Sequence, residues 1–248
     1  MPTQQPPPTQ QQGQPPTTGQ QIPLLPTPPA VQQPARPTLN VVVLDPAHGG
    51  PDPGARGSSG MNESEIVMDF ARSIRAALES EGFRVVQTRS GNDDPSFDDR
   101  SAVANAQRGA VFITLHASST GTAGQVRVYS DLLTGAGGSA APGGPGFPAR
   151  NGLLPWDRAQ ESYLGASRRL AEITQAWVGQ KIPGSPSAPL SAPIRQLRTV
   201  AAPAIAIEIS NVSVNNRDQL IKLAPGLADA VAQATAAFRP IYEGAARF

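Results

Sequence analysis

The 248-residue sequence predicts an α/β domain with three layers, in which helices flank a mostly parallel central sheet, preceded by a disordered tail. From about residue 39 onward, short apolar runs that are typical of buried parallel strands alternate with longer segments of helical periodicity. Before that point the sequence is dominated by Pro and Gln, and Arg36 is its only charged side chain. Such a segment cannot bury enough apolar surface to offset the entropy of ordering it. We therefore expect a disordered linker at 1–38 and one folded domain at 39–248.

The elements of the folded domain follow from this alternation. Apolar runs predict strands at 40–44, 84–88, 111–115, 125–130 and 204–207. Helical spacing of apolar residues predicts helices at 63–80, 99–107, 158–178 and 225–238. The intervening segment 133–154 is rich in Gly, Pro and Ala, which indicates a lid or binding loop, or a loop without a role of its own.

The predicted helix at 63–80 begins with residues suited to its amino end. Asn62 fits the N-cap and Glu65 the third helical position, which is the arrangement of a capping box. Glu63 occupies the first helical position, where the helix dipole favours an ionised carboxylate and so a competent metal ligand. A surface acid that only stabilises the helix would look the same.

The chain has only two histidines, and each follows an apolar run: His48 comes after 41–44 and His116 after 110–115. Either histidine alone would be more typical of a structural residue. Parallel strands place their carboxyl ends at one edge of the sheet, so we expect both imidazoles at that edge. Two imidazoles and one carboxylate, in a chain without cysteine, match the three-ligand set of catalytic zinc sites. Cations that prefer oxygen ligands would not need the histidines, so the sequence favours zinc.

Four short motifs carry a resemblance to a known family. Residues 44–57 read L-D-P-A-H-G-G-P-D-P-G-A-R-G, which is close to the pattern D-P-G-H-G-G-x-D-P-G-A-x-G with alanine in place of one glycine. The other three motifs are T-R at 88–89, R-x-x-x-A-N at 100–105 and T-L-H-A at 114–117. These motifs resemble the zinc-dependent N-acetylmuramoyl-L-alanine amidases of the Amidase_3 type. The resemblance implies zinc held by His48, Glu63 and His116, and hydrolysis of the amide between N-acetylmuramic acid and the L-alanine of the peptidoglycan stem peptide.

Glu208 stands at the end of the apolar run 204–207. Burying an unpaired carboxylate is costly, so it needs a metal, a hydrogen-bonded partner or a raised pKa. The resembling family carries P-A-V-L-V-E-x-G-F here, and this chain matches it up to the acid, with Ser210 and Asn211 in place of the glycine and phenylalanine. The resemblance implies that Glu208 is the catalytic residue, which takes a proton from water and returns it to the leaving amine.

Two further residues are expected to contact the substrate. Arg198 precedes the Glu208 strand, where the family has a basic residue, and is placed to pair with a carboxylate of the stem peptide. A solvated or ion-paired arginine is the alternative. Trp156 lies beside 133–154 and is the aromatic residue to test for sugar stacking, whereas most aromatic residues of the following helix are expected to pack in the core.

The composition argues against several other classes of protein. The chain has no cysteine nucleophile and no G-x-S-x-G motif, and residues 49–60 lack the lysine of a nucleotide-binding P-loop. A net charge of +1 with scattered basic residues argues against nucleic-acid binding. No stretch approaches the roughly 18 apolar residues of a membrane span.

The resemblance also implies a place of action and partners. Peptidoglycan lies outside the cytoplasm, so we expect an exported monomer that binds peptidoglycan or muropeptides, with the need for an activator protein left open. The sequence shows no signal peptide, which we interpret as a chain that continues upstream. The Gly and Pro content of 133–154 argues against a helix that covers the zinc, so we expect an open site. The alternatives are an inactive peptidoglycan-binding module of the same fold, and a scaffold without zinc whose Pro/Gln tail docks a partner.

Overall fold

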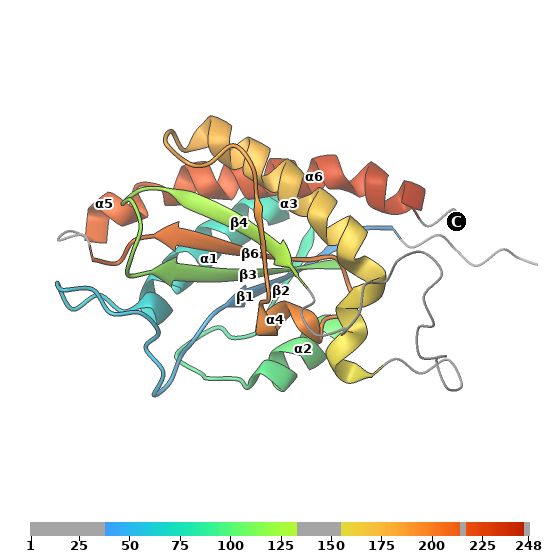
Figure 1. Ribbon diagram of the computed structural model, residues 1–248, viewed down its shortest axis with the longest axis horizontal. Coiled ribbons are helices and arrows are strands. Elements are labelled where there is room, and N and C mark those ends of the chain that lie inside the picture. The colour runs from blue at the N-terminus through green and yellow to red at the C-terminus, as the bar shows by residue number, and fades with distance from the viewer. Residues whose placement is uncertain (1–37, 133–154, 214–216, 246–248) are drawn as a thin grey trace, which may run out of the picture. The chain divides into compact units, whose positions relative to one another are not determined.

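The computed structural model describes residues 38–132, 155–213 and 217–245. Within these residues, six strands form one sheet in the order β2-β1-β3-β6-β4-β5 (Figure 1). The strands are β1 (Val41–Pro46), β2 (Arg84–Gln87), β3 (Ala110–Ser118), β4 (Val126–Asp131), β5 (Leu190–Ala192) and β6 (Ala204–Ser210). Strand β4 runs antiparallel to β6, and every other neighbouring pair is parallel. The predicted mostly parallel sheet is confirmed.

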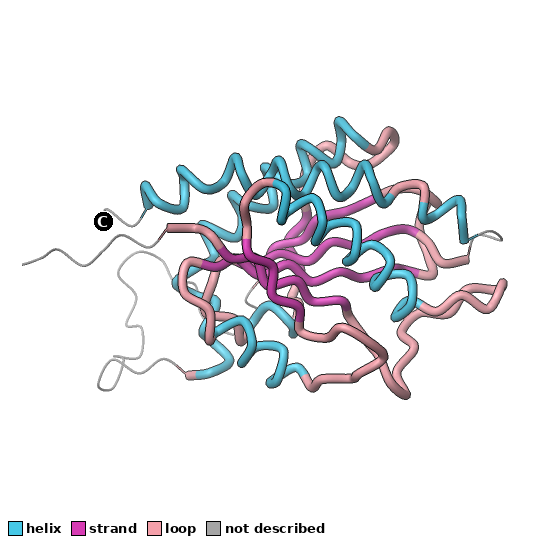
Figure 2. The backbone as a smooth tube through the Cα atoms, turned by 180° about the vertical axis from the view of Figure 1, so that it is seen from behind, coloured by secondary structure: helices cyan, strands magenta, loops and turns pink. Residues whose placement is uncertain are grey.

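Helices lie on both sides of this sheet (Figure 2). On one face, α1 (Glu63–Ser80) and α3 (Leu164–Lys181) pack on the strands, and α6 (Ala224–Ala245) packs against both helices. On the other face lie α2 (Phe97–Asn105) and α4 (Arg195–Arg198), with the 3-10 helix η2 (Trp156–Tyr163) against α4, while the short α5 (Arg217–Ile221) contacts α1. The predicted three-layer arrangement is confirmed. None of the helices in the described part of the chain has the length and apolar character needed to cross a membrane.

Strand β1 shows why both faces need cover. Val42 and Leu44 belong to the larger core beneath α1, α3 and α6, whereas Val41 and Val43 belong to the smaller core on the opposite face. A strand buried on both faces carries apolar side chains at successive positions, which is the continuous run seen in the sequence.

Several element boundaries differ from the prediction, and tertiary contacts account for two of them. Strand β3 continues to Ser118, since its pairing with β6 extends that far, so His116 lies inside the strand rather than after it. The segment predicted as one helix at 158–178 is a 3-10 helix up to Tyr163 and an α-helix from Leu164 onward. In the 3-10 part, the buried amide of Gln160 donates to two carbonyl groups of the segment before β6, so this contact governs the local geometry.

The capping of α1 and the start of α2 also differ from the prediction. Asn62 is the N-cap of α1, but its side chain makes no cap hydrogen bond, so the predicted capping box with Glu65 is wrong. The N–H groups of Glu63 and Ser64 donate instead to carbonyl groups of the loop 53–55, which satisfies donors that a capping side chain would otherwise take. A capping box does form at the start of α2, which therefore begins two residues earlier than predicted.

Three short elements, β5, α4 and α5, were not predicted, because they are too short to show a period. The predictions for the Pro/Gln linker and for an open site beneath 133–154 fall outside the described residues.

Candidate metal centre

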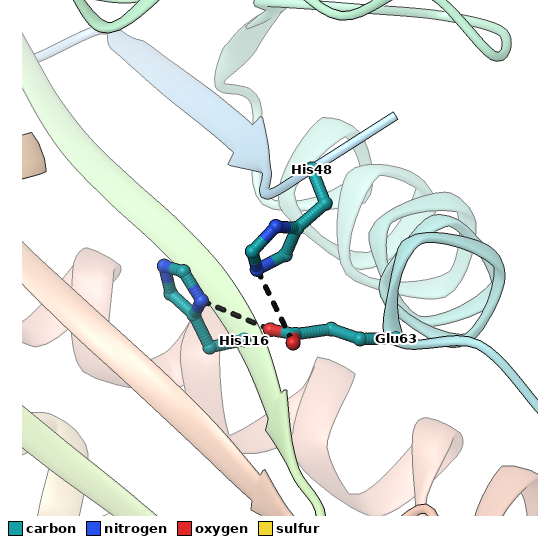
Figure 3. Close-up of side chains that lie close together, drawn as sticks. All are labelled: His48, Glu63 and His116. Atoms are coloured by element: carbon teal, nitrogen blue, oxygen red, sulfur yellow. Dashed lines mark hydrogen bonds and ion pairs between the residues drawn. The ribbon is translucent and has the colours of Figure 1, made fainter. Parts of the chain in front are cut away.

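Three side chains converge at the carboxyl edge of the sheet. Figure 3 shows His48 from the loop after β1, Glu63 from the first turn of α1 and His116 from β3 pointing toward one another. His48 Nε2 lies 3.2 Å from Glu63 Oε2, and His116 Nδ1 lies 3.0 Å from Glu63 Oε1. One potential ligand atom of each residue lies within 4.8 Å of the other two. The structure therefore brings the three predicted ligands into a group that could hold a metal ion.

Glu63 is a buried carboxylate with a full set of partners. Besides the two histidines, its Oε2 accepts a hydrogen bond of 2.8 Å from the Ala55 N–H and its Oε1 one of 2.9 Å from the Ala117 N–H. Burial by itself raises the pKa of Glu63, but the hydrogen bonds from His116, His48 and Ala55 outweigh it and hold that pKa well below its usual range. Glu63 is therefore ionised at neutral pH.

His48 is held from behind by a second carboxylate. Its Nδ1 donates a 2.7 Å hydrogen bond to Asp52 Oδ2. The hydrogen bond to Glu63 raises the pKa of His48, and burial lowers it. The hydrogen bond to Asp52 raises it further, so the pKa reaches about 9. A carboxylate behind a metal-ligating imidazole fixes the ring and makes it a stronger ligand. Sequence reasoning did not single out Asp52, although its spacing of four residues from His48 was visible.

The loop that carries His48 has a strained backbone. His48 has a φ of 62°, and it is the one non-glycine residue with positive φ among those described. Such a conformation persists only where the surroundings determine it. Arg89 donates to the carbonyl groups of Pro46 and Ala47, and Arg100 donates to those of Pro46 and His48. Both arginines are buried, and their hydrogen bonds hold the backbone of this loop in place.

Asp45, on β1, connects these arginines to the sheet. Its side chain is fully buried and accepts hydrogen bonds from Arg100 at 2.7 Å, from Thr88 at 2.5 Å and from Thr114 at 2.8 Å. These partners come from three of the four motifs that carry the family resemblance. The motifs therefore describe one buried network that positions His48, in addition to the ligands themselves.

A glycine of the same loop is required by its close approach to the centre. Gly54 has a φ of +65°, and a Cβ atom there would lie 2.5 Å from Glu63 Oε2 and 2.6 Å from His48 Cδ2. Any side chain at this position would displace two of the three converging residues.

Glu208 lies beside the centre on the neighbouring strand. In the parallel pair β3 and β6 it stands in register with His116, and the Tyr129 hydroxyl donates a 3.3 Å hydrogen bond to its Oε1. Glu208, His116, Tyr129 and Ile194 are among the residues that line a cavity of about 360 Å³. The carboxylate therefore shares a cavity with one of the converging histidines.

A second cavity, of about 380 Å³, lies on the His48 side of the centre. It is lined by His48, Asp52 and Phe97 among others. Arg195 and Gln196, the first two residues of α4, line both cavities. The start of α4 thus forms a shared border between the two cavities beside the metal centre.

The two residues predicted to contact substrate lie on α4 and η2. Arg198, at the end of α4, is half-buried. Burial raises the pKa of Asp131, and the positive charge of Arg198 opposes this rise. Trp156 begins η2 with 53% of its surface exposed. Neither residue lines the two cavities described above. Their contact with substrate therefore stays a prediction.

Besides Asp52, sequence reasoning missed two residues that contact the site. Tyr129 lies in a correctly predicted strand, but the sequence did not indicate that this strand would neighbour β6. Gln196 Nε2 lies 3.3 Å from His116 Nε2, and no periodicity or motif marks this glutamine. Only the pairing of distant segments reveals either contact.

Several solved structures of amidases have a similar fold. The chain matches N-acetylmuramoyl-L-alanine amidase from Clostridium difficile 630 with a TM-score of 0.60 and 20% identity, over 81% of this chain and 97% of that one. It matches Ami1 from Mycobacterium smegmatis with a TM-score of 0.62 and 20% identity, over 84% and 100% of the two chains. CwlD from Clostridioides difficile, solved in complex with the GerS lipoprotein, gives a TM-score of 0.59 at 16% identity over 82% and 99%. These similarities define the class as the α/β fold of amidase catalytic domains.

The family follows from the sequence match. The profile of the Amidase_3 family, described as N-acetylmuramoyl-L-alanine amidase, matches residues 42–237, and the chain belongs to this family. AmiC from Neisseria meningitidis serogroup B is 37% identical over 103 residues, which are 41% of this chain and 25% of that protein. AmiA from Escherichia coli K12 is 39% identical over 77 residues, or 31% and 27% of the two chains. The matched region thus spans about a quarter of the length of these relatives.

Proposed function

We propose that this protein is a zinc-dependent hydrolase of the amide bond between N-acetylmuramic acid and the L-alanine of the peptidoglycan stem peptide. The observation that carries the proposal is the convergence of His48, Glu63 and His116 at one edge of the sheet, with Glu208 in register beside His116. Membership of the amidase family supports the choice of bond and substrate.

The donor set and its spacing support zinc. Zinc takes nitrogen and oxygen ligands at about 2.0–2.2 Å in a tetrahedron, which puts neighbouring ligand atoms roughly 3.3 Å apart. His48 Nε2 lies 3.2 Å from one Glu63 oxygen and His116 Nδ1 lies 3.0 Å from the other, and one ligand atom of each residue lies within 4.8 Å of the other two, so the group is compact enough to surround one ion. Three protein ligands are typical of catalytic sites that keep a fourth position for water or substrate. When bound, zinc supplies Lewis acidity, which polarises the amide carbonyl and makes water a better nucleophile at neutral pH.

The residues of the chain supply positioning and proton transfer. Glu208 faces the cavity that His116 also lines, and the Tyr129 hydroxyl holds one of its carboxylate oxygens. From this position Glu208 takes a proton from the attacking water and delivers it to the leaving amine of L-alanine. We propose that the scissile amide lies at the shared border of the two cavities, with the sugar and peptide portions of the substrate on either side of Gln196.

The biological setting is part of the same proposal. Because its substrate is peptidoglycan, the protein is expected to act outside the cytoplasm as a monomer that binds peptidoglycan or muropeptides. Contact of Arg198 and Trp156 with substrate, and dependence on an activator protein, belong to the proposal as well.

Digestion of purified peptidoglycan tests the function directly. We expect release of stem peptides that begin with L-alanine, identified by mass spectrometry. A chelator should abolish this release and added zinc should restore it. Unchanged release in chelator would contradict the zinc mechanism. Bound zinc without release would instead support an inactive or activator-dependent binding module of the same fold.

Zinc binding is expected to release protons. The pKa of His48 is about 9 in the metal-free protein, so at pH 7 the imidazole is protonated and must lose its proton to bind zinc. Glu63, whose pKa is lowered, is already ionised and contributes no proton. Calorimetry at pH 7 in buffers of different ionisation enthalpy should therefore show release of about one proton from His48, falling toward zero above its pKa.

The same shift predicts how the metal-free protein responds to pH. Because the folded-state pKa lies above the ordinary value of 6.5, protonated His48 stabilises the fold below pH 6.5, and this contribution is lost as the pH rises through about 9. Asp52→Asn should move both effects to lower pH, because the Asp52 hydrogen bond and charge raise the pKa of His48. Zinc binding at pH 7 with no proton release would contradict the raised pKa of His48.

A further inference from the structure

The two ring nitrogens of His116 have different partners. Nδ1 faces Glu63 and the metal centre, whereas the other nitrogen points away from Glu63 (Figure 3). That nitrogen, Nε2, lies 3.3 Å from the side-chain amide nitrogen of Gln196. The amide is the hydrogen-bond partner of the nitrogen that does not face Glu63.

The backbone that carries Gln196 is well anchored. Its neighbour Leu197 is fully buried in the smaller core, and the Leu197 N–H donates to the Ile194 carbonyl. Helix α4 also packs against α2, β4 and β6. The backbone of Gln196 is therefore anchored beside His116, and a glutamine amide presents either its nitrogen or its oxygen by a turn about χ3.

The chemistry at Nε2 differs between the metal-free and the metal-bound protein. With its amide nitrogen toward His116, Gln196 donates to Nε2, so the imidazole proton is on Nδ1 and donates to Glu63. A metal ion on Nδ1 requires the other tautomer, in which that proton has left Nδ1 and Nε2 carries one instead. Nε2 then needs an acceptor, which Gln196 supplies by turning its amide so that Oε1 faces the ring.

We propose that Gln196 is the positioning residue of His116, donating to Nε2 in the metal-free protein and accepting from Nε2–H in the metal-bound protein. This inference rests on the zinc site of the proposed function. A glutamine can form a hydrogen bond in both states, because its amide carries a donor and an acceptor that exchange places by rotation about χ3. A carboxylate can only accept from Nε2–H of the metal-bound tautomer, and an apolar side chain can form neither hydrogen bond.

Gln196 thus has for His116 the role that Asp52 has for His48. The Asp52 carboxylate accepts from His48 Nδ1 at 2.7 Å, on the side of the ring away from Glu63. Partners behind metal-ligating histidines fix the ring and its tautomer, and their loss typically costs about 10- to 100-fold in metal affinity or activity.

Zinc affinity, measured by competition with a fluorescent chelator, tests the proposal without relying on turnover. Gln196→Leu should weaken zinc binding about 10- to 100-fold. Gln196→Glu should retain the wild-type affinity or exceed it, because a carboxylate accepts from Nε2–H. Gln107→Leu is the matched control, since this glutamine contacts Arg84 and Val103 away from the centre, and it should bind zinc as the wild type does.

A nuclear magnetic resonance measurement reports on the tautomer itself. In the zinc-loaded protein the Nε2–H signal of His116 should be visible and protected from exchange with water, and Gln196→Leu should remove that protection. Thermal unfolding of the metal-free variants shows that each is folded, and Gln196→Met, which keeps the length of the side chain, replaces the leucine variant if the latter does not fold.

The outcomes separate this inference from the proposed function. If the wild-type protein binds no zinc, both are overturned. If the wild type binds zinc and Gln196→Leu binds it equally tightly, with the Nε2–H signal unchanged, only the role of Gln196 is overturned. Equal weakening by Gln196→Leu and Gln196→Glu would likewise overturn it, because it would indicate a packing effect.

Discussion

Replacing Glu208 by glutamine is expected to lower kcat/KM for muropeptide cleavage by about 10²- to 10⁴-fold, the usual contribution of a general acid–base residue. Glutamine keeps the shape of the side chain and an oxygen that accepts from Tyr129, but it cannot take a proton from water. Zinc binding should remain, since Glu208 is not among the three converging residues. The rate of release of L-alanyl stem peptides and the zinc content of the same preparation measure the two effects.

An exposed glutamate supplies the control for this substitution. Glu172 pairs with Arg169 on the surface of α3, and Glu172→Gln should leave both rate and zinc content unchanged. Loss of zinc from Glu208→Gln would contradict the acid–base role and would indicate that Glu208 is a ligand. Retention of the full rate would show that another group transfers the proton.

Replacing Arg100 by methionine is expected to lower the free energy of unfolding by about 3–5 kcal/mol, the usual cost of removing one partner from a buried ion pair. Arg100 and Asp45 are both buried, and their charged groups lie 2.7 Å apart. Without the guanidinium, the Asp45 carboxylate keeps only the hydroxyls of Thr88 and Thr114, and the carbonyl groups of Pro46 and His48 lose a donor. Denaturant unfolding of the metal-free protein measures the change.

Two comparisons isolate the buried pair. Arg108 is exposed, and Arg108→Met should change stability by no more than about 0.5 kcal/mol. Combining Arg100→Met with Asp45→Asn should cost less than the sum of the two single substitutions, because the uncompensated buried charge is then removed. A loss below about 1 kcal/mol for Arg100→Met would show that the pair contributes little to the fold.

Zinc affinity should fall together with stability in Arg100→Met. Arg100 holds the carbonyl of His48, whose φ of 62° is sustained by contacts from outside the loop. Without the hydrogen bonds of Arg100, His48 is free to leave the geometry in which its Nε2 faces Glu63. An unaltered zinc affinity would mean that Arg89 alone is sufficient to hold the loop.

Much of the fold was predictable because the sheet is buried on both faces. Continuous apolar runs at 41–44 and 110–115 are required of central parallel strands, and amphipathic spacing at 63–80 is required of a helix that covers them. The same logic predicted that His48 and His116 lie at one edge of the sheet. Glu63 could be added because the start of a helix is recognisable from the sequence.

Predictions failed where tertiary partners replaced local ones. The Asn62 capping box did not form because the loop 53–55 takes the N–H groups at the start of α1. The first part of the predicted helix at 158–178 is a 3-10 helix, in which Gln160 is bonded to a distant segment. Local propensity cannot anticipate such partners, because they come from remote parts of the chain.

By itself, the sequence determined the α/β class, the order of the main elements and the residues His48, Glu63, His116 and Glu208 as candidates, because these depend on local periodicity and on residue chemistry. Only the tertiary structure decided that Asp45, Arg89 and Arg100 form one network around the His48 loop, and that Tyr129 and Gln196 contact Glu208 and His116. These contacts join segments tens of residues apart, through strand order and the position of a four-residue helix. Neither the strand order nor the position of this helix has a local signal in the sequence, because both depend on how the layers pack at the edge of the sheet.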